Sequence, residues 1–190
     1  MKGATIRAFV ALDLDATSIR RVVRVADRLR MGSGAPSATW TSVPKLHVTL
    51  KFMGELAANA AAPLGMALRA LAEGKAAPPP CSLRLGAFPS VEEARVVVVE
   101  LEDCSGQIAK LADRVARLSA KHGVPREEQR FRPHVTLARL KRPYDARRWI
   151  RADLAEGAGD CKASHLTLYQ SESGPSGTAY TPLARFPFDA

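Results

Sequence analysis

Cysteine is scarce in this sequence, and its scarcity excludes two common ways of stabilising a small protein. Only Cys81, Cys104 and Cys161 occur in 190 residues. Their number is odd and no two lie close together, which argues against a disulfide framework and against a cysteine-based zinc site. A reducing cytoplasm is therefore the compartment that we expect for this chain.

Long apolar runs are also missing. No stretch reaches the ~18 residues that a membrane-spanning helix needs, so we expect no association with a membrane. The N-terminal segment MKGATIRAFVALDLD contains a short apolar run, but Asp13 and Asp15 end it without a cleavage-like segment. We interpret it as a first strand and not as a signal peptide.

Acidic residues are too few to balance the basic ones. The chain has 28 Lys and Arg against 19 Asp and Glu, which gives a formal net charge of +9 and a pI near 9.9. Such a balance favours a polyanionic partner, with RNA or DNA ahead of a membrane surface. An arginine-rich surface without any such partner is the alternative. The 46% of hydrophobic residues is typical of a globular protein.

Hydrophobic periodicity predicts alternating strands and helices along the chain. Helices are expected at 16–31, 57–73 and 105–122, with a short one at 145–155. Strands are expected at 4–12, 46–53, 81–89, 94–102, 130–140, 161–170 and 178–186. Each half thus offers strands and helices around one similar motif, but the halves are too small to fold alone. We therefore expect a single bilobal α+β domain over residues 1–190.

The repeated motif is the tetrapeptide HVTL. It occurs at 47–50 and again at 134–137, and a related HLTL occurs at 165–168. In a strand, alternate side chains share a face, so each motif presents a histidine and a threonine together. Strand histidines with no catalytic role remain the alternative, because strands favour threonine and tolerate histidine.

Two such strands in one cleft would supply the groups for displacement at phosphorus. One imidazole can remove a proton from the nucleophile while the other protonates the leaving oxygen. The threonine hydroxyls can donate hydrogen bonds to phosphoryl oxygens. This chemistry needs no metal if the leaving group is good, as in a strained cyclic phosphate diester.

The residues around the motifs favour the first two copies over the third. Cations and aromatic side chains, which suit a phosphate and a base, flank both HVTL segments: Lys51 and Phe52 for the first, and Arg130, Phe131, Arg132 and Arg139 for the second. His165 has only Lys162 nearby. Acidic residues do not cluster around either motif, which disfavours a metallophosphoesterase, and no nucleophile elbow is visible.

Several segments together resemble the 2H phosphoesterase superfamily, and within it the bacterial and archaeal RNA 2′,3′-cyclic phosphodiesterases, also called 2′-5′ RNA ligases. They are RAFVALDL at 7–14, WTSVPKLHVTLKFMGEL at 40–56, LRLGAFPS at 83–90, RFRPHVTLARLK at 130–141 and LTLYQSESGPSGTAYTPLARFPF at 166–188. The resemblance implies two α+β lobes related by a pseudo-twofold axis. Mostly antiparallel sheets would line a central cleft, with the helices outside.

The same resemblance implies roles for individual residues. His47 would protonate the leaving ribose oxygen, and His134 would accept a proton from water. Thr49 and Thr136 would belong to the two motifs, Arg139 would lie near the phosphate, and Phe52 would lie against a base. Beside the resemblance, the threonine hydroxyls and the flanking Arg130 are candidates for binding the substrate. No metal and no cofactor are implied, and His165 matches no motif position. Gln170 and Val98 depart from the pattern, which expects a basic and an aromatic residue there, so substrate contacts near them stay open.

We therefore expect a monomeric, cytoplasmic enzyme that opens RNA 2′,3′-cyclic phosphate ends to 2′-phosphates, with weak reverse 2′-5′ ligation conceivable. One alternative is a catalytically idle RNA-binding protein that uses the same basic cleft. Another is a hydrolase of small cyclic phosphates or of 2′-5′ oligonucleotides. Two titratable groups in one cleft favour catalysis over binding alone.

Overall fold

The chain folds around one antiparallel sheet in the order β4-β5-β6-β3-β1-β7-β8, with β2 paired to β6. The computed structural model describes residues 4–32, 36–126, 130–175 and 177–189. The strands are β1 (Thr5–Leu14), β2 (Ala38–Trp40), β3 (Val48–Ala57), β4 (Ser82–Phe88), β5 (Ala94–Glu102), β6 (His134–Tyr144), β7 (Ala163–Gly174) and β8 (Gly177–Pro187). The expected α+β class is confirmed.

A narrow connection joins two parts of this sheet. β4, β5, β6 and β2 form one part, and β3, β1, β7 and β8 form the other. The two parts meet where β3 pairs with β6, and within the described residues this pairing consists only of Val48 and Val135. The strands of each part pair over much longer stretches, and both motif strands lie at this junction.

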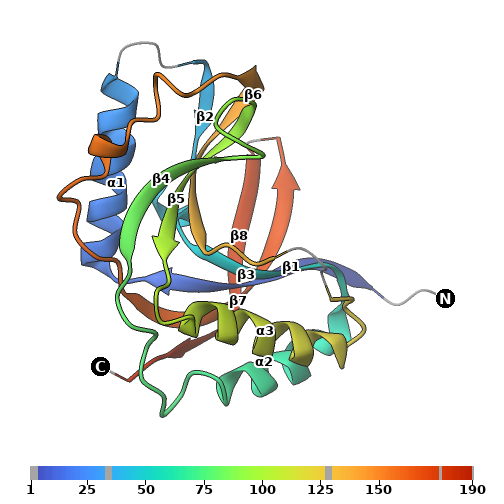
Figure 1. Ribbon diagram of the computed structural model, residues 1–190. Coiled ribbons are helices and arrows are strands. Elements are labelled where there is room, and N and C mark those ends of the chain that lie inside the picture. The colour runs from blue at the N-terminus through green and yellow to red at the C-terminus, as the bar shows by residue number, and fades with distance from the viewer. Residues whose placement is uncertain (1–3, 33–35, 127–129, 176, 190) are drawn as a thin grey trace.

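Three α-helices in the described residues pack on the sheet, and the first and third have the amphipathic pattern that the sequence predicts. α1 (Ala16–Met31) begins after Asp15, whose carboxylate accepts a hydrogen bond from the Ser18 backbone N–H, an ordinary N-cap. α1 lies beside β4 and β5, whereas α2 (Ala61–Arg69) and α3 (Gln107–Ala120) lie against the part that contains β1 and β3 (Figure 1).

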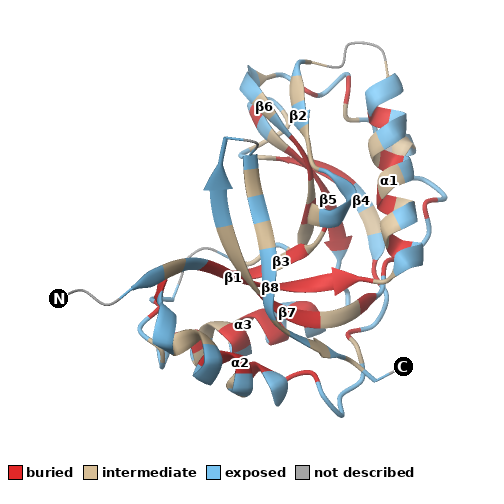
Figure 2. Ribbon diagram, turned by 180° about the vertical axis from the view of Figure 1, so that it is seen from behind, coloured by how far each residue is buried: buried red, intermediate tan, exposed pale blue. Residues whose placement is uncertain are grey.

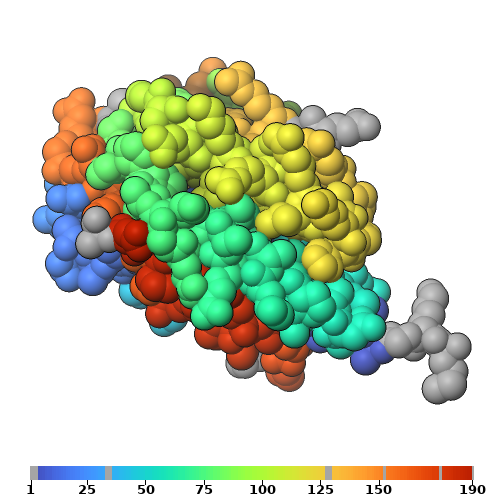
Figure 3. Space-filling model, turned by 90° about the horizontal axis from the view of Figure 1, so that it is seen from below, coloured from blue at the N-terminus to red at the C-terminus, as the bar shows by residue number. Residues whose placement is uncertain are grey.

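The hydrophobic core lies between the helices and the sheet. α1 buries Val22, Val25 and Leu29, and the central strands β1 and β3 are buried over much of their length (Figure 2). Seen from below, α2 and α3 cover the face of the molecule beneath the central strands (Figure 3).

Most predicted elements are present, but the helix expected at 145–155 is wrong. This segment makes one hydrogen-bonded turn, in which the Ala146 carbonyl accepts from Ile150 N–H at 2.7 Å, and a short 3₁₀ helix, η3 (Ala152–Leu154). Ala146 N–H donates instead to the Val91 carbonyl, and the buried Trp149 indole donates to the Leu29 carbonyl at 3.0 Å. These tertiary bonds fix the segment as turns.

Two smaller differences concern element length. The helix expected at 57–73 is divided into η2 (Ala58–Ala60) and the shorter α2, and the sequence pattern does not predict the short strand β2. Within the described residues, no helix is long and apolar enough to cross a membrane.

Candidate active site

The two HVTL strands are neighbours in the sheet. β3 and β6 run antiparallel, with Val48 paired to Val135. Continuing this register by one residue in each direction sets Thr49 beside His134 and His47 beside Thr136. By this register the histidine of each motif lies across from the threonine of the other, so all four residues belong to one junction.

His47 lies in a cage of aromatic rings. Its ring stacks on Phe9 at a centroid distance of 4.9 Å and meets Tyr180 edge-on at 5.5 Å. Its Nε2 lies 3.1 Å from Thr49 Oγ1. Burial lowers the pKa of His47 from 6.5 to about 4, against the opposing effects of a hydrogen bond to the Lys45 backbone and of the Asp13 charge.

His134 has a more cationic environment. Its ring meets Phe88 edge-on at 4.8 Å. Burial lowers its pKa, and the charges of Arg132 and Arg139 lower it further, while Glu100 opposes them. The structure therefore keeps this imidazole neutral near pH 7.

Both motif histidines are oriented by the backbone two residues earlier. His134 Nδ1 lies 2.7 Å from the Arg132 carbonyl, and His47 bonds to the Lys45 backbone. A carbonyl can only accept, so the proton of the neutral His134 ring is on Nδ1 and its Nε2 has a free lone pair. This tautomer leaves Nε2 able to act as a base.

A buried carboxylate stands on the strand next to each motif histidine. Glu100 on β5 pairs directly with His134, and Asp13 on β1 lies one residue beyond the pair Leu12 and Val48, opposite His47. Both carboxylates are 8% exposed. They supply negative charge beside imidazoles that the surrounding apolar groups desolvate.

Different donors hold the two carboxylates. Asp13 accepts hydrogen bonds from Thr167 Oγ1 at 2.9 Å, Tyr169 Oη at 2.8 Å and Arg185 Nε at 2.8 Å. Glu100 is instead paired with two guanidinium groups, those of Arg84 and Arg132. The His134 side of the junction consequently carries more positive charge than the His47 side.

A β-bulge at the last residue of each motif changes which of the following side chains share the motif's face. Leu50 has no partner in the register of β1, and Leu137 has none in that of β5. A bulge shifts the alternation by one residue. Lys51 is therefore buried while Phe52 is 61% exposed, and Arg139 is exposed two residues after the bulge.

A cavity of about 920 Å³ opens beside the junction. Of the seven residues predicted for the site, Thr49, Phe52, Arg130 and His134 line it. The remaining three, His47, Thr136 and Arg139, do not line this cavity. His47 is enclosed by rings, as described above, and Arg139 is close enough to His134 to affect its pKa.

His165 lines a different and smaller cavity of about 250 Å³, together with Asp15 and Lys162. Its Nδ1 lies 3.0 Å from Ser164 Oγ. The threonine of this third motif, Thr167, bonds to Asp13 and thereby supports the surroundings of His47.

The two departures from the family pattern have clear positions. Gln170 lies on β7, and its side chain donates to Glu172 at 3.1 Å. Val98 is fully buried on β5, paired with Thr136 of the second motif. A larger side chain at Val98 would therefore press on the motif strand.

Sequence reasoning missed the carboxylates beside the histidines. By pattern, Asp13 only ends the first strand, and Glu100 belongs to an ordinary strand. A carboxylate within an otherwise apolar strand, as in FVALD and VVVVE, was the available signal. The described residues contain no group of three or more His, Cys, Asp or Glu side chains that could hold a metal ion.

Comparisons with known proteins identify the family. A model of the 2′-5′ RNA ligase superfamily matches residues 19–175. The RNA 2′,3′-cyclic phosphodiesterase of Aeropyrum pernix is 31% identical over 169 residues, which cover 87% of this chain and 93% of that protein.

Solved structures show the same fold. A protein of Thermus thermophilus aligns with a TM-score of 0.75 at 27% identity, covering 96% of this chain and 98% of that one. Escherichia coli LigT complexed with 3′-AMP aligns with a TM-score of 0.72 at 22% identity, covering 98% of this chain and 100% of that one. The family model and the A. pernix relative both extend over most of the sequence, and this chain therefore belongs to the 2′-5′ RNA ligase superfamily, with a LigT-like α+β fold.

Proposed function

We propose that this protein hydrolyses RNA 2′,3′-cyclic phosphate ends to 2′-phosphates by general acid–base catalysis with two histidines. The observation that carries the proposal is the junction of β3 and β6, where two imidazole–hydroxyl pairs meet beside a basic cavity. The curated relative from A. pernix is an RNA 2′,3′-cyclic phosphodiesterase, which supports this choice of substrate.

His134 acts as the base in this proposal. Its Nε2 takes a proton from water while the water oxygen bonds to phosphorus. Its Nδ1 bond to the Arg132 carbonyl holds that tautomer, and the nearby guanidinium charges disfavour a resting imidazolium. A neutral imidazole is the form that a base requires.

His47 acts as the acid. As the bond between phosphorus and the ribose 3′ oxygen breaks, the imidazolium gives its proton to that oxygen, which leaves a 3′-hydroxyl and a 2′-phosphate. Asp13 favours the protonated form while burial opposes it. The negative charge of a bound phosphate diester adds to the Asp13 effect and raises the pKa of His47 in the complex, which favours the protonated form that an acid requires.

The hydroxyls of Thr49 and Thr136 donate hydrogen bonds to the non-bridging phosphoryl oxygens, and Arg139 and Arg130 supply positive charge. Phe52 is exposed beside the motif, where it can stack on a base. If a 5′-hydroxyl of a second RNA takes the place of water, the same proton transfers produce a 2′-5′ linkage. Weak ligation is therefore part of the proposal.

We place the enzyme in the cytoplasm as a monomer that needs neither metal nor cofactor. Hydrolysis of small cyclic phosphates or of 2′-5′ oligonucleotides is the alternative for the same chemistry. A catalytically inactive RNA-binding protein is disfavoured, because binding alone does not need two oriented imidazoles that each lie beside a buried carboxylate.

Incubation with an oligonucleotide that ends in a 2′,3′-cyclic phosphate should yield a 2′-phosphate product at the same rate with and without EDTA. The reason is that imidazoles carry both proton transfers and no metal polarises the phosphate. Resolution of the products by chromatography, with authentic 2′- and 3′-phosphates as standards, measures this. Loss of turnover in EDTA that zinc, magnesium or manganese restores would contradict the mechanism.

The pH dependence of kcat/KM should be bell-shaped, with its optimum below pH 6.5. Activity requires neutral His134 and protonated His47. As the pH increases, kcat/KM therefore rises when His134 loses its proton and falls when His47 loses its proton. Burial lowers both pKa values in the free enzyme, that of His47 to about 4.

The kcat profile should lie at higher pH, because the bound phosphate anion raises both pKa values. Initial rates from acid to mildly alkaline pH at constant ionic strength measure the two profiles. A kcat/KM that does not change across this range would be incompatible with a histidine acid–base pair.

A further inference from the structure

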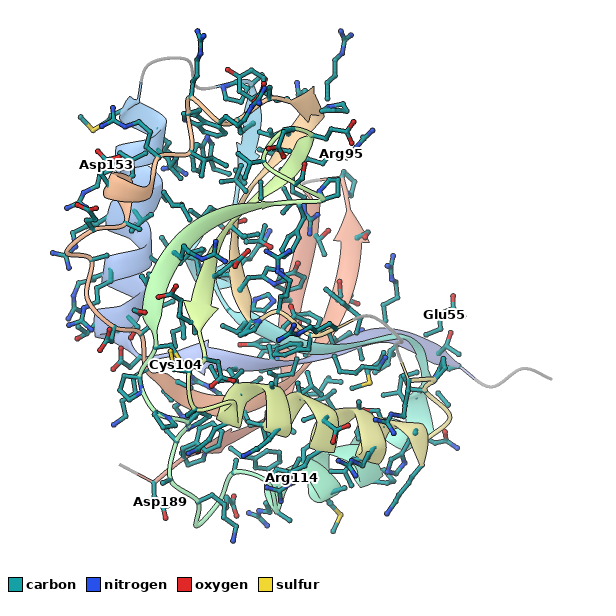
Figure 4. All side chains as sticks on the ribbon, viewed as in Figure 1. Glu55, Arg95, Cys104, Arg114, Asp153 and Asp189 are labelled. Carbon is teal, nitrogen blue, oxygen red and sulfur yellow. The ribbon has the colours of Figure 1, made fainter. Side chains whose placement is uncertain are left out.

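We propose that Glu100 is a positioning residue for His134, because it holds Arg132, whose backbone and side chain together fix the imidazole. The inference rests on the proposed function, in which His134 is the base, and deepens it. Glu100 itself does not line the cavity beside His134. Its strand, β5, lies between β4 and β6 in the sheet and ends at Glu102, close to Cys104, which Figure 4 labels.

Strand pairing places the Glu100 side chain next to the His134 ring. The two residues lie opposite each other in β5 and β6. In the neighbouring pair, Leu101 N–H donates a backbone hydrogen bond to the Pro133 carbonyl at 2.9 Å. Because hydrogen-bonded and non-hydrogen-bonded pairs alternate along antiparallel strands, Glu100 and His134 form a non-hydrogen-bonded pair, in which side chains approach most closely.

Arg132 connects the carboxylate to the ring in two ways. Its guanidinium forms an ion pair with Glu100, while its backbone carbonyl lies 2.7 Å from His134 Nδ1. The same guanidinium lies 4.5 Å from the centre of the Phe88 ring, and Phe88 meets the His134 ring edge-on at 4.8 Å. Holding Arg132 in place therefore fixes both the acceptor of the Nδ1 proton and the phenyl ring that packs against the imidazole.

Glu100 is itself held in place. It is 8% exposed, and a second guanidinium, that of Arg84 on the neighbouring strand β4, also pairs with it. The two ion pairs offset the cost of burying this carboxylate. Gly86 on β4 leaves room for it, because a Cβ added at Gly86 would lie only 2.8 Å from Glu100 Oε1. The carboxylate thus occupies space that a larger residue at position 86 would need.

The charge of Glu100 also affects how basic His134 is. The charged and titratable groups around this ring come from its own segment, from β5 and from the first motif strand: Arg132, Arg139, Glu100, His47 and Lys51. Glu100 supplies the negative charge among them and raises the pKa of His134 against burial and the two arginines. Without this carboxylate the imidazole would be a weaker base.

The test measures kcat, KM and their pH profiles for Glu100→Gln, which keeps the size of the side chain and removes its charge. The limb of kcat/KM that rises with pH reports His134, and it should move to lower pH because a nearby carboxylate no longer stabilises the imidazolium. The falling limb should stay where it is. We expect kcat to drop by roughly tenfold as the ring loses its fixed orientation, whereas KM should change by less than about twofold.

The matched control is Glu102→Gln. Glu102 lies two residues further along β5 and also pairs with Arg84, at 3.8 Å, but it is opposite Ser82 in the sheet and not paired with His134. This variant should keep the kcat and the pH profile of the natural chain. Thermal unfolding gives the folded fraction of each variant, to which the rates are corrected.

A second variant, Gly86→Ala, displaces the carboxylate without removing it. The added methyl group would meet the far end of the Glu100 side chain, so the carboxylate must move while the backbone stays. This change should lower kcat in the same direction as Glu100→Gln. In a Glu100→Ala background it should have no further effect, because the clashing oxygen is gone.

A rising limb that stays in place in Glu100→Gln, or equal changes in the Glu100 and Glu102 variants, would overturn the positioning role. An effect of Gly86→Ala that persists undiminished in the Glu100→Ala background would overturn it as well.

NMR titration of the His134 ring in the free protein separates this inference from the proposed function. Glu100→Gln should lower the midpoint of that titration whether or not the chain hydrolyses a cyclic phosphate. An unchanged midpoint would overturn the inference and leave the proposed function intact. A lowered midpoint in a protein that does not hydrolyse the cyclic end would support the link between Glu100 and His134 and overturn the proposed function alone.

Discussion

Replacing His134 by alanine should lower turnover of a 2′,3′-cyclic phosphate end by roughly 10²–10⁴-fold, the usual weight of a general base. The side chain lies at the junction of the motif strands, and its Nδ1 bond to the Arg132 carbonyl leaves Nε2 unprotonated in the neutral ring. Its removal therefore leaves water without a proton acceptor. Single-turnover rates with saturating enzyme measure the chemical step and separate it from binding.

Two controls accompany this variant. Thr136→Ala should lose less, because it removes one hydrogen bond to a phosphoryl oxygen and no proton transfer. His165→Ala should have nearly unchanged turnover, since that ring lines a separate cavity. A large loss in the His165 variant with little loss in the His134 variant would show that the wrong pair of motifs has been assigned to catalysis.

The His47→Ala variant should lose turnover by a similar factor on the natural substrate. It should regain most of that turnover when sulfur replaces the 3′ bridging oxygen of the substrate. A thiol has a pKa of about 8.5, far below that of an alcohol, so a thiolate leaves without being protonated. The acid is then unnecessary, whereas the base is still needed. His134→Ala should accordingly gain little from the same substitution.

The measurement is the rate of each variant relative to the natural enzyme on the same substrate, which cancels the intrinsic reactivity of the sulfur compound. Equal recovery in both variants would mean that the histidines share the two roles. Recovery in His134→Ala alone would mean that acid and base are reversed. Asp13 raises the pKa of His47 while burial lowers it to about 4, and Glu100 raises the pKa of His134 against burial and two arginines. The rescue experiment therefore decides the order of acid and base.

Local patterns in the sequence determined much of this fold. The stripe containing Val22 and Leu29 predicted α1 with the bounds that the structure has, because helical periodicity and an N-cap are properties of a short segment. The duplicated HVTL likewise identified both motif strands. Its interpretation as a pair of catalytic histidines remains a prediction, which the variants above test.

Pairing between distant strands decided the rest. Strict alternation from His47 would bury Phe52 and expose Lys51, but the structure has the reverse. The bulges responsible exist only in the register with β1 and β5, and a register cannot be derived from one strand alone. Phe52 is exposed, and the contact with a base that the resemblance to a family implies for it remains a prediction.

Strand pairing also places the carboxylates beside the histidines. Asp13 and Glu100 are far from His47 and His134 in the sequence, and only strand pairing brings them together. Likewise, Trp149 bonds to the Leu29 carbonyl, 120 residues away, and its segment forms turns where its own composition suggested a helix. Residue type and spacing thus determined which groups could do the chemistry. Long-range hydrogen bonding determined which face each side chain occupies and which charge it meets, because those depend on partners that a local pattern does not contain.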